Sequence, residues 1–193
     1  KAYKIDIHHV LHSPMQQYIP SIGPREAVDV AHAYSLAREA LGDEIDIIVH
    51  CHNELDLPSA VKVAEAVEPI KPLYLEDPLA PEFSESWKTL RRSTRVPLLT
   101  GENIALAEGA LPFLQSGAVD SLQPDLLQCG GITGGKRIAD LAALYRVPVS
   151  CHNVSGYVLD MASQQFSAAI FNCPLMECRR RAAEAPEATG EKL

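Results

Sequence analysis

The 193-residue chain lacks the features that mark a general nucleic-acid-binding or membrane protein. It has 17 Lys and Arg against 25 Asp and Glu, which gives a formal net charge of −8 and leaves no basic stripe for a phosphate backbone. We expect no signal peptide, and no apolar run is long enough to span a bilayer. We therefore expect a cytoplasmic protein without nucleic-acid or membrane partners. The negative net charge does not exclude anionic substrates, because one bound metal ion can reverse the local electrostatic field.

The chain also lacks cysteine pairing. Its five cysteines are an odd number, and no two of them form a C-x-x-C motif. This pattern disfavours a disulfide framework and fits a reducing compartment. Cys51 and Cys151 each precede a histidine, but we expect them to be small apolar residues in a packed wall rather than metal ligands.

A glycine-rich phosphate loop is missing as well. The nearest candidate is the segment GGITGG at 130–135, which follows a strand-like run. It has neither G-x-G-x-x-G spacing nor a Walker lysine, so we interpret it as a tight strand-to-helix turn. Its absence weighs against a doubly wound nucleotide-binding sheet.

Short apolar segments alternate with helical ones along the chain. The apolar runs show no polar alternation, as expected for strands buried on both faces. The pattern predicts an α/β fold, and recurring polar strand ends favour a TIM-type parallel β/α barrel over a doubly wound sheet. The predicted strands are 2–7, 45–50, 73–77, 97–102, 121–125, 148–152 and 175–178, and the predicted helices are 24–42, 59–70, 84–94, 105–115, 133–146 and 158–171.

The barrel is expected to be incomplete. A closed barrel of this type needs about eight strands, whereas seven are predicted here and the chain starts inside one of them. We therefore expect strands 2 to 8 of a barrel in residues 1–178, followed by a polar tail at 179–193. The long connection 7–23 is expected to lie on the substrate side.

Acids and histidines recur at the ends of the predicted strands. Successive members are separated by 26, 26, 23, 27 and 25 residues, each about one strand–helix unit. A parallel barrel brings its strand ends to one face, so these side chains are expected to converge on one pocket that supports metal binding and proton transfer. The six residues are His50, Glu76, Glu102, Asp125, His152 and Glu177.

The order of these residues resembles the barrel domain of the enolase superfamily. It is most similar to the mandelate racemase and muconate lactonizing enzyme group, including its acid-sugar dehydratases. The matching words are LYLEDPLAPE, LLTGEN, LQPDLLQCGGIT and CHNVSG, within a resemblance that runs from about residue 4 to 177. We expect no counterpart of the family's usual N-terminal α+β capping domain within these residues.

The resemblance implies a divalent metal ion, usually Mg²⁺, held by His50, Glu76 and Glu102. The ion would neutralise charge that develops on a substrate carboxylate. For Glu76 and Glu102 the alternative is a helix-capping or surface acid. The family has aspartate where this chain has His50, and a nitrogen ligand suits Mn²⁺, Fe²⁺ or Zn²⁺ better than Mg²⁺. His50 either binds the ion or leaves that position to water.

The resemblance also implies a base. Asp125 and His152 match an Asp–His dyad in which the carboxylate orients the ring and raises its basicity. The alternative is that Asp125 and His152 form a purely structural hydrogen bond, which the sequence does not distinguish from a catalytic pair.

Three further residues are assigned on the opposite face and the last strand. Lys4 could act as a second base or pair with the substrate carboxylate, and Asp6 replaces the second lysine of a Lys-x-Lys motif. His52 lies two residues beyond His50 and either protonates a departing hydroxide or only hydrogen-bonds in the pocket. Glu177 matches a hydrogen-bonding or acid group. The other histidines, His8, His9, His12 and His32, are expected on loops and helix surfaces.

Together these features predict a lyase that removes the proton α to a carboxylate and eliminates water from a sugar acid. A racemase or epimerase that uses Lys4 against His152 is the alternative within enzymes. A non-catalytic or truncated barrel relative is the alternative outside them. The expected partner is a small carboxylate substrate, and the exposed helices of such barrels favour a homo-oligomer.

Overall fold

The computed structural model describes residues 1–12, 18–19 and 21–178. The chain divides into two compact units, one formed by 1–100 and 112–121 and the other by 101–111 and the residues from 122 onward. The predicted polar tail at 179–193 and part of the predicted loop at 7–23 lie outside the described residues. Within the described part, no helix is both long and apolar enough to cross a membrane.

Parallel strands form the centre of the first unit. They are β1 (Ala2–Asp6), β2 (Asp46–His50), β3 (Tyr74–Glu76) and β4 (Leu98–Thr100), each paired with the next in parallel. The sheet order is β1-β2-β3-β4-β5, and β5 (Ser121–Leu122) starts with the last residue of this unit. Five of the seven predicted strands are confirmed. The buried residues of β2 and β4 agree with a parallel sheet covered on both faces.

The strand register places three polar residues at one level of the sheet. Asp6 is paired with His50, and His50 is paired with Glu76, at the carboxyl ends of β1, β2 and β3. Residues at the same level of neighbouring parallel strands point to the same side. The sheet therefore brings together side chains that are 26 and more positions apart in the sequence.

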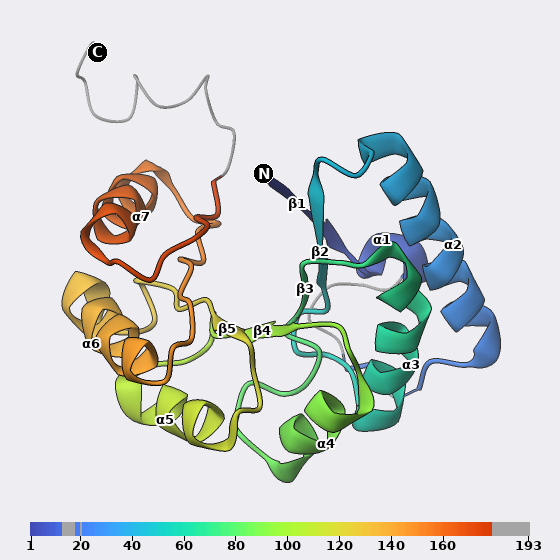
Figure 1. Cartoon of the computed structure of the whole chain (residues 1–193), viewed down its shortest axis with the longest axis horizontal. Coiled ribbons are helices and arrows are strands. Elements are labelled where there is room, and N and C mark those ends of the chain that lie inside the picture. Colours follow the sequence, from blue (N-terminus) through green and yellow to red (C-terminus); the bar gives the residue numbers. More distant parts are fainter. Residues whose placement is uncertain (13–17, 20, 179–193) are drawn as a thin grey trace. The chain divides into compact units, whose positions relative to one another are not determined.

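Helices pack beside these strands in the first unit. They are α1 (His8–Leu11), α2 (Pro24–Leu41), α3 (Leu57–Val67) with the 3₁₀ turn η1 (Glu68–Ile70), and α4 (Glu85–Ser93). In Figure 1, α2 and α3 run side by side next to β1–β3. The hydroxyl of Tyr34 in α2 donates to the carbonyl of Ile5 at 2.8 Å, which fastens the helix to β1.

Sequence signals at the helix ends explain where these helices begin. Pro24 occupies the first turn of α2, where its missing N–H costs no hydrogen bond, and Glu26 accepts a bond from the backbone of Gly23 at 2.7 Å. Asp56 precedes α3 and accepts from the backbone N–H of Ser59 at 2.8 Å. The predicted helix at 24–42 is confirmed almost to the residue.

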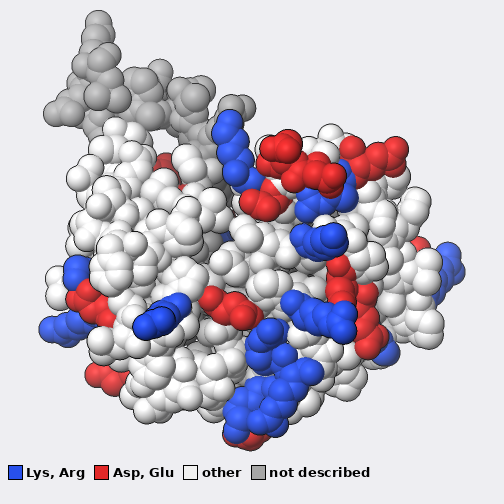
Figure 2. All heavy atoms as spheres, in the orientation of Figure 1, with Lys and Arg blue, Asp and Glu red and all other residues white. Residues whose placement is uncertain are grey.

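Aromatic packing fixes α4 in the first unit. Trp87 is fully buried, meets Phe113 edge to face with ring centres 5.3 Å apart, and donates from Nε1 to the carbonyl of Ala80 at 3.0 Å. The opposite face of α4 is charged, and Figure 2 shows basic side chains gathered over this helix. Lys88 pairs with Glu85 at 2.8 Å, as expected for a solvated helix face.

Long helices make up much of the described part of the second unit. They are α6 (Gly131–Leu144) and α7 (Tyr157–Ala169), and the unit also holds the first residues of α5 (Ala107–Ser116). All three agree with predicted helices to within two residues at the start. Buried Ile138, Leu159 and Phe166 contribute to the core of this unit.

Regular strands at 148–152 and 175–178 were predicted wrongly. Among the described residues, 148–152 joins the fold through the isolated bridges Leu122↔Val149 and Asp125↔His152, and 175–178 has no strand assignment. Prolines explain the interruption, because Pro124 and Pro148 have no N–H to donate to a ladder. The same effect ends β5 at Leu122, three residues before the predicted end.

The segment at 130–135 is only partly the turn that was predicted. Gly130 and Gly131 have φ of 93° and 69°, so they make the sharp reversal before α6. Gly134 and Gly135 instead lie inside α6. A Cβ at Gly134 would lie 1.7 Å from the carbonyl oxygen of Cys129, so only glycine lets α6 approach this backbone.

We predict that Gly134→Ala destabilises the protein by about 3 kcal/mol or more, the upper end of typical overpacking, because backbone rather than a side chain must move. Gly109→Ala is the matched control. Gly109 is exposed in α5, and its nearest neighbour would be 3.4 Å away, so alanine there is expected to raise stability by about 0.5–1 kcal/mol. Chemical denaturation measures the stability of both variants. Equal denaturation midpoints for the two variants would contradict the prediction.

Candidate active site

Polar residues gather in the first unit at the carboxyl ends of β1, β2 and β3. Lys4 on β1 reaches across to Glu76, with Nζ 2.6 Å from Oε1. Glu76 is fully buried, so the lysine balances a carboxylate that water does not reach. The other carboxylate oxygen, Oε2, is buried without a hydrogen-bond partner among the described residues. A cation beside Glu76 would satisfy that oxygen.

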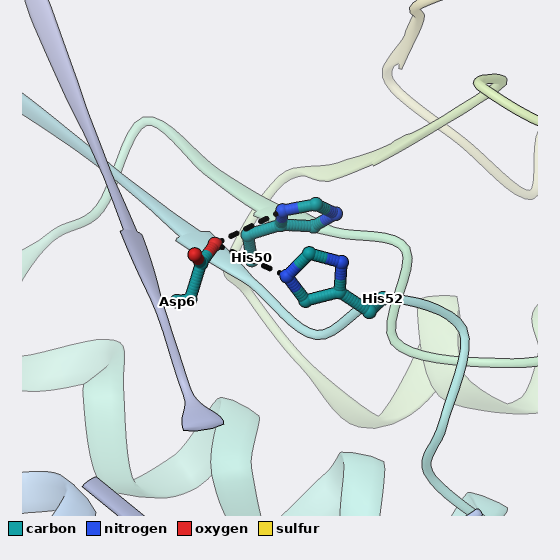
Figure 3. Close-up of side chains that lie close together, drawn as sticks. All are labelled: Asp6, His50 and His52. Atoms are coloured by element: carbon teal, nitrogen blue, oxygen red, sulfur yellow. Dashed lines mark hydrogen bonds and ion pairs between the residues drawn. The ribbon is translucent and has the colours of Figure 1, made fainter. Parts of the chain in front are cut away.

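Asp6 links two histidine rings. Its Oδ1 lies 3.2 Å from Nδ1 of His50 and 3.2 Å from Nε2 of His52. Figure 3 shows both rings directed at the same carboxylate, and their centres are 3.8 Å apart. The hydrogen bonds from the two rings hold the pKa of Asp6 well below its usual range. Asp6 was noted in the sequence only as a departure from a lysine motif, so its part in this cluster was missed.

Backbone turns after β2 and β3 direct these side chains. His52 and Asn53 have φ of 54° and 62°, and Asp77, directly after β3, has φ of 47°. Non-glycine residues seldom adopt this left-handed region. Asn53 stabilises the turn by donating from its backbone to the carbonyl of Asp77 at 2.6 Å and from its side chain to Leu79 at 2.7 Å. His52 thus reaches the cluster through a turn, and not through the strand alternation that the sequence suggested.

His50 faces acids on both sides of its ring. Its Nε2 lies 3.7 Å from Oε1 of Glu76 and 3.8 Å from Oδ2 of Asp77. Burial lowers the pKa of His50, but the charge of Glu76 and the contact with Asp6 outweigh it, so the pKa is raised. Asp77 is held in turn by the hydroxyl of Thr100, at 2.5 Å. Asp77 is the second acid of the LYLEDP motif, and only the first, Glu76, was assigned a role from the sequence.

His8 was predicted wrongly as a loop or surface residue. It is 4% exposed, because the short helix α1 turns it inward, and its Nε2 lies 3.2 Å from Oε2 of the equally buried Glu54. Its ring centre is 4.8 Å from that of His52. Burial and the neighbouring charge of His52 lower the pKa of His8. No apolar period marks residues 8–11, so no local pattern indicates that this histidine is buried.

A second group of polar residues lies within the second unit. Asp125 and His152 are close, as predicted, with Oδ2 2.8 Å from Nδ1, and the bridge between their backbones sets this distance. The other ring nitrogen, Nε2, lies 3.1 Å from Oε2 of Glu102. Asp125 also accepts from the backbone N–H of Leu127 at 2.7 Å through its other oxygen. The ring is therefore held on both sides.

Glu177 is placed by Asn153, the residue after His152. Its Oε2 accepts from the backbone of Asn153 at 2.9 Å, and its carbonyl accepts from the side chain at 3.2 Å. Asn153 also donates to Asp160 at 2.7 Å. This buried asparagine was missed in the sequence, where only the CHN word pointed to it. Glu177 adds negative charge near His152, which helps to raise its pKa.

The buried cysteines are not nucleophiles in this arrangement. Burial raises the pKa of Cys51 well above its usual value, and burial raises that of Cys151 to about 11. Both are fully buried, as expected for small residues in a packed wall. A thiol with a raised pKa carries little thiolate near neutral pH.

The first unit offers donor atoms for a cation. Asp6, His50 and His52 present one ligand atom each within 4.8 Å of one another, and so do His50, Glu76 and Asp77. Oε2 of Glu76 has no hydrogen-bond partner among the described residues, so a cation there would satisfy it. Carboxylate oxygens suit Mg²⁺, whereas imidazole nitrogen suits later first-row ions.

We predict that His152 keeps its proton to an unusually high pH in metal-free protein. Burial lowers its pKa, but hydrogen bonds to Asp125 and Glu102 and the charge of Glu177 raise it to about 10. Because this folded-state pKa exceeds the ordinary value of about 6.5, the stabilisation is complete below about pH 6.5 and is lost as pH rises through about 10.

Nuclear magnetic resonance of the imidazole, recorded in chelator, measures the pKa of His152. Glu102→Gln should lower it, whereas Glu108→Gln, which changes an exposed acid on α5, should leave it unchanged. A pKa near 6.5 in the wild-type protein would contradict the prediction.

Comparison with known proteins agrees with the resemblance seen in the sequence. The sequence profile of the enolase C-terminal domain-like family matches residues 1–188. D-gluconate dehydratase from Thermoproteus tenax is 36% identical over 148 residues, which cover 77% of this chain and 30% of that protein. D-xylonate dehydratase from Haloferax volcanii is 40% identical over 139 residues, which cover 72% of this chain and 34% of that protein.

Solved structures show the same relationship. A mandelate racemase/muconate lactonizing enzyme-like protein from Rubrobacter xylanophilus superposes with a TM-score of 0.83 and 34% identity, covering 92% of this chain and 45% of that one. A member of the enolase superfamily from Salmonella Typhimurium gives a TM-score of 0.87 at 28% identity, with 93% and 46% covered.

The likeness to these structures confirms the predicted class of fold, a TIM-type parallel β/α barrel represented in part. The chain spans about a third of the length of the curated dehydratases that it matches. Its sequence profile, its fold and its relatives all agree, and the chain belongs to the enolase superfamily, in the mandelate racemase and muconate lactonizing enzyme group.

Proposed function

We propose that this chain supplies the barrel residues of a metal-dependent sugar-acid dehydratase. The reaction would remove the proton α to the substrate carboxylate and then eliminate water through an ene-diolate intermediate. The observation that carries the proposal is the ring of His152, held between Asp125 at 2.8 Å and Glu102 at 3.1 Å. The names of the curated relatives, which include D-gluconate and D-xylonate dehydratases, support the choice of substrate class.

A divalent ion would be held by Glu76 and Glu102, with His50 as the third candidate ligand. Support comes from Oε2 of Glu76, which has no hydrogen-bond partner in the part of the chain that the structure describes, and from the position of Glu102 two residues after β4. Nε2 is the nitrogen of His50 that faces Glu76. When bound, Mg²⁺ or Mn²⁺ would neutralise charge developing on the substrate carboxylate.

His152 is the proposed base. Asp125 accepts the Nδ1 proton, which leaves the lone pair of Nε2 to take the α-proton when the ring is neutral. Two fixed contacts on Asp125 prevent the ring from turning. A base held in this way reaches the same substrate atom in each turnover.

The remaining residues are assigned by their contacts. His52 is the proposed acid for the departing hydroxide, and its ring is 18% exposed, so a substrate can reach it. Lys4 would orient the substrate carboxylate or Glu76. Glu177 would position the segment after His152 through Asn153.

Epimerisation by two bases has less support. It would need Lys4 as a neutral base, but its Nζ lies 2.6 Å from a fully buried carboxylate oxygen of Glu76. An ion pair in a buried setting favours the charged form of the lysine. We therefore retain dehydration as the proposal.

The proposal is tested by incubating the protein with D-gluconate and D-xylonate in deuterated buffer with Mg²⁺ or Mn²⁺. A 2-keto-3-deoxy acid is the expected product. If deuterium instead enters the α-carbon of both epimers without net elimination, the epimerase alternative holds. If neither product forms, both hypotheses are contradicted.

We predict that His152→Asn lowers kcat for this elimination by about 10²- to 10⁴-fold, the usual contribution of a positioned base. Glu102→Gln should abolish turnover through loss of Mg²⁺ binding, measured by calorimetry with Mg²⁺. His32→Asn changes an exposed histidine on α2 and should leave both quantities unchanged. Wild-type activity in His152→Asn would overturn the assignment of the base.

A further inference from the structure

We propose that Asp6, His50 and His52 bind a first-row transition-metal ion at a second site, separate from the one proposed at Glu76 and Glu102. The ligand atoms would be Oδ1 of Asp6, Nδ1 of His50 and Nε2 of His52. This inference goes beyond the proposed function and does not depend on it. Figure 3 shows the three side chains facing one another at the ends of β1 and β2.

The distances match those of a metal site. Oδ1 of Asp6 lies 3.2 Å from each of the two nitrogens. Each of the three residues also offers a ligand atom within 4.8 Å of the ligand atoms of the other two. Ligands bonded to a tetrahedral zinc ion at about 2.0–2.1 Å are separated by about 3.3 Å. The ion would fit at the centre of the group with small rotations of the rings.

The donor atoms select the kind of ion. Two imidazole nitrogens and one carboxylate oxygen suit Zn²⁺, Co²⁺, Fe²⁺ or Mn²⁺, whereas Mg²⁺ prefers oxygen ligands alone. Three protein ligands leave at least one position for water or a substrate oxygen. Asp6 is 29% exposed and His52 is 18% exposed, so such a molecule can enter.

The fold holds these three residues in place before any ion binds. Asp6 and His50 are paired across β1 and β2, and His50 is 4% exposed. His52 reaches them through a backbone turn with φ of 54°, a strained conformation that residues other than glycine seldom adopt. A binding site is a reason to keep such a turn at this position.

His50 determines how the two sites are related. A neutral imidazole has one lone pair, so coordination through Nδ1 leaves the proton on Nε2, which faces Glu76 and Asp77. In this state His50 donates a hydrogen bond toward the acids and is not a ligand of the ion at Glu76. The substitution of histidine for the family aspartate would then have created a second site, and not only altered the first.

Cobalt titration tests the proposal, because Co²⁺ absorbs visible light when bound by nitrogen and oxygen in a low-coordinate site. The titration is run in excess Mg²⁺, which fills sites built from oxygen alone. We expect one Co²⁺ per chain in the wild-type protein and in Glu102→Gln. Asp6→Asn and His52→Asn should bind Co²⁺ at least about 100-fold more weakly, beyond the roughly 10- to 100-fold loss that follows removal of an outer hydrogen-bond partner.

His32→Asn is the matched control and should bind as the wild type does. Thermal unfolding without metal identifies any variant that fails to fold, and His52→Asn, at a partly exposed position, keeps the test available if Asp6→Asn does not fold. The proposal is overturned if Asp6→Asn and His52→Asn bind Co²⁺ like the wild type, or if Glu102→Gln alone removes binding. If the wild-type protein binds Co²⁺ but does not turn over a sugar acid, that result counts against the proposed function and not against this second site.

Discussion

The parallel register of β1, β2 and β3 is the constraint on which the polar cluster of the first unit depends. Because Asp6, His50 and Glu76 occupy one level, each side chain meets the next without any long-range adjustment of the backbone. A shift of one residue in any strand would turn its polar group to the other face. The buried apolar residues of β2 make such a shift costly, so hydrophobic packing also positions the acids and histidines.

The sequence was informative where repeating physical patterns decide the structure. Helix spacing, Pro24 and the apolar runs predicted the helices and the first five strands, since these signals are local. The Asp125–His152 pair was expected from the resemblance to the family, and a bridge between their backbones sets the two side chains 2.8 Å apart. The strand expected at 148–152 is reduced to isolated bridges because Pro124 and Pro148 lack a ladder donor, an effect that the apolar pattern does not show.

The side-chain cluster was less predictable than the strands that hold it. Asp6 looked like an isolated departure, since nothing local shows that register brings it to His50. His8 is buried by a four-residue helix too short to give a periodic signal. The left-handed turn at His52 also has no simple sequence mark, because histidine is not a residue that demands it. Roles for these residues therefore rest on the structure, and the family alone would have assigned fewer of them.

Asp125 uses both of its oxygens, one on the ring of His152 and one on the backbone N–H two residues along. The short side chain closes a loop on its own backbone, so the carboxylate has no alternative orientation to sample. The fixed carboxylate favours the tautomer of neutral His152 that carries its proton on Nδ1, because that proton can be donated to Oδ2. Glutamate, with one more rotatable bond, would carry the same charge without fixing that choice.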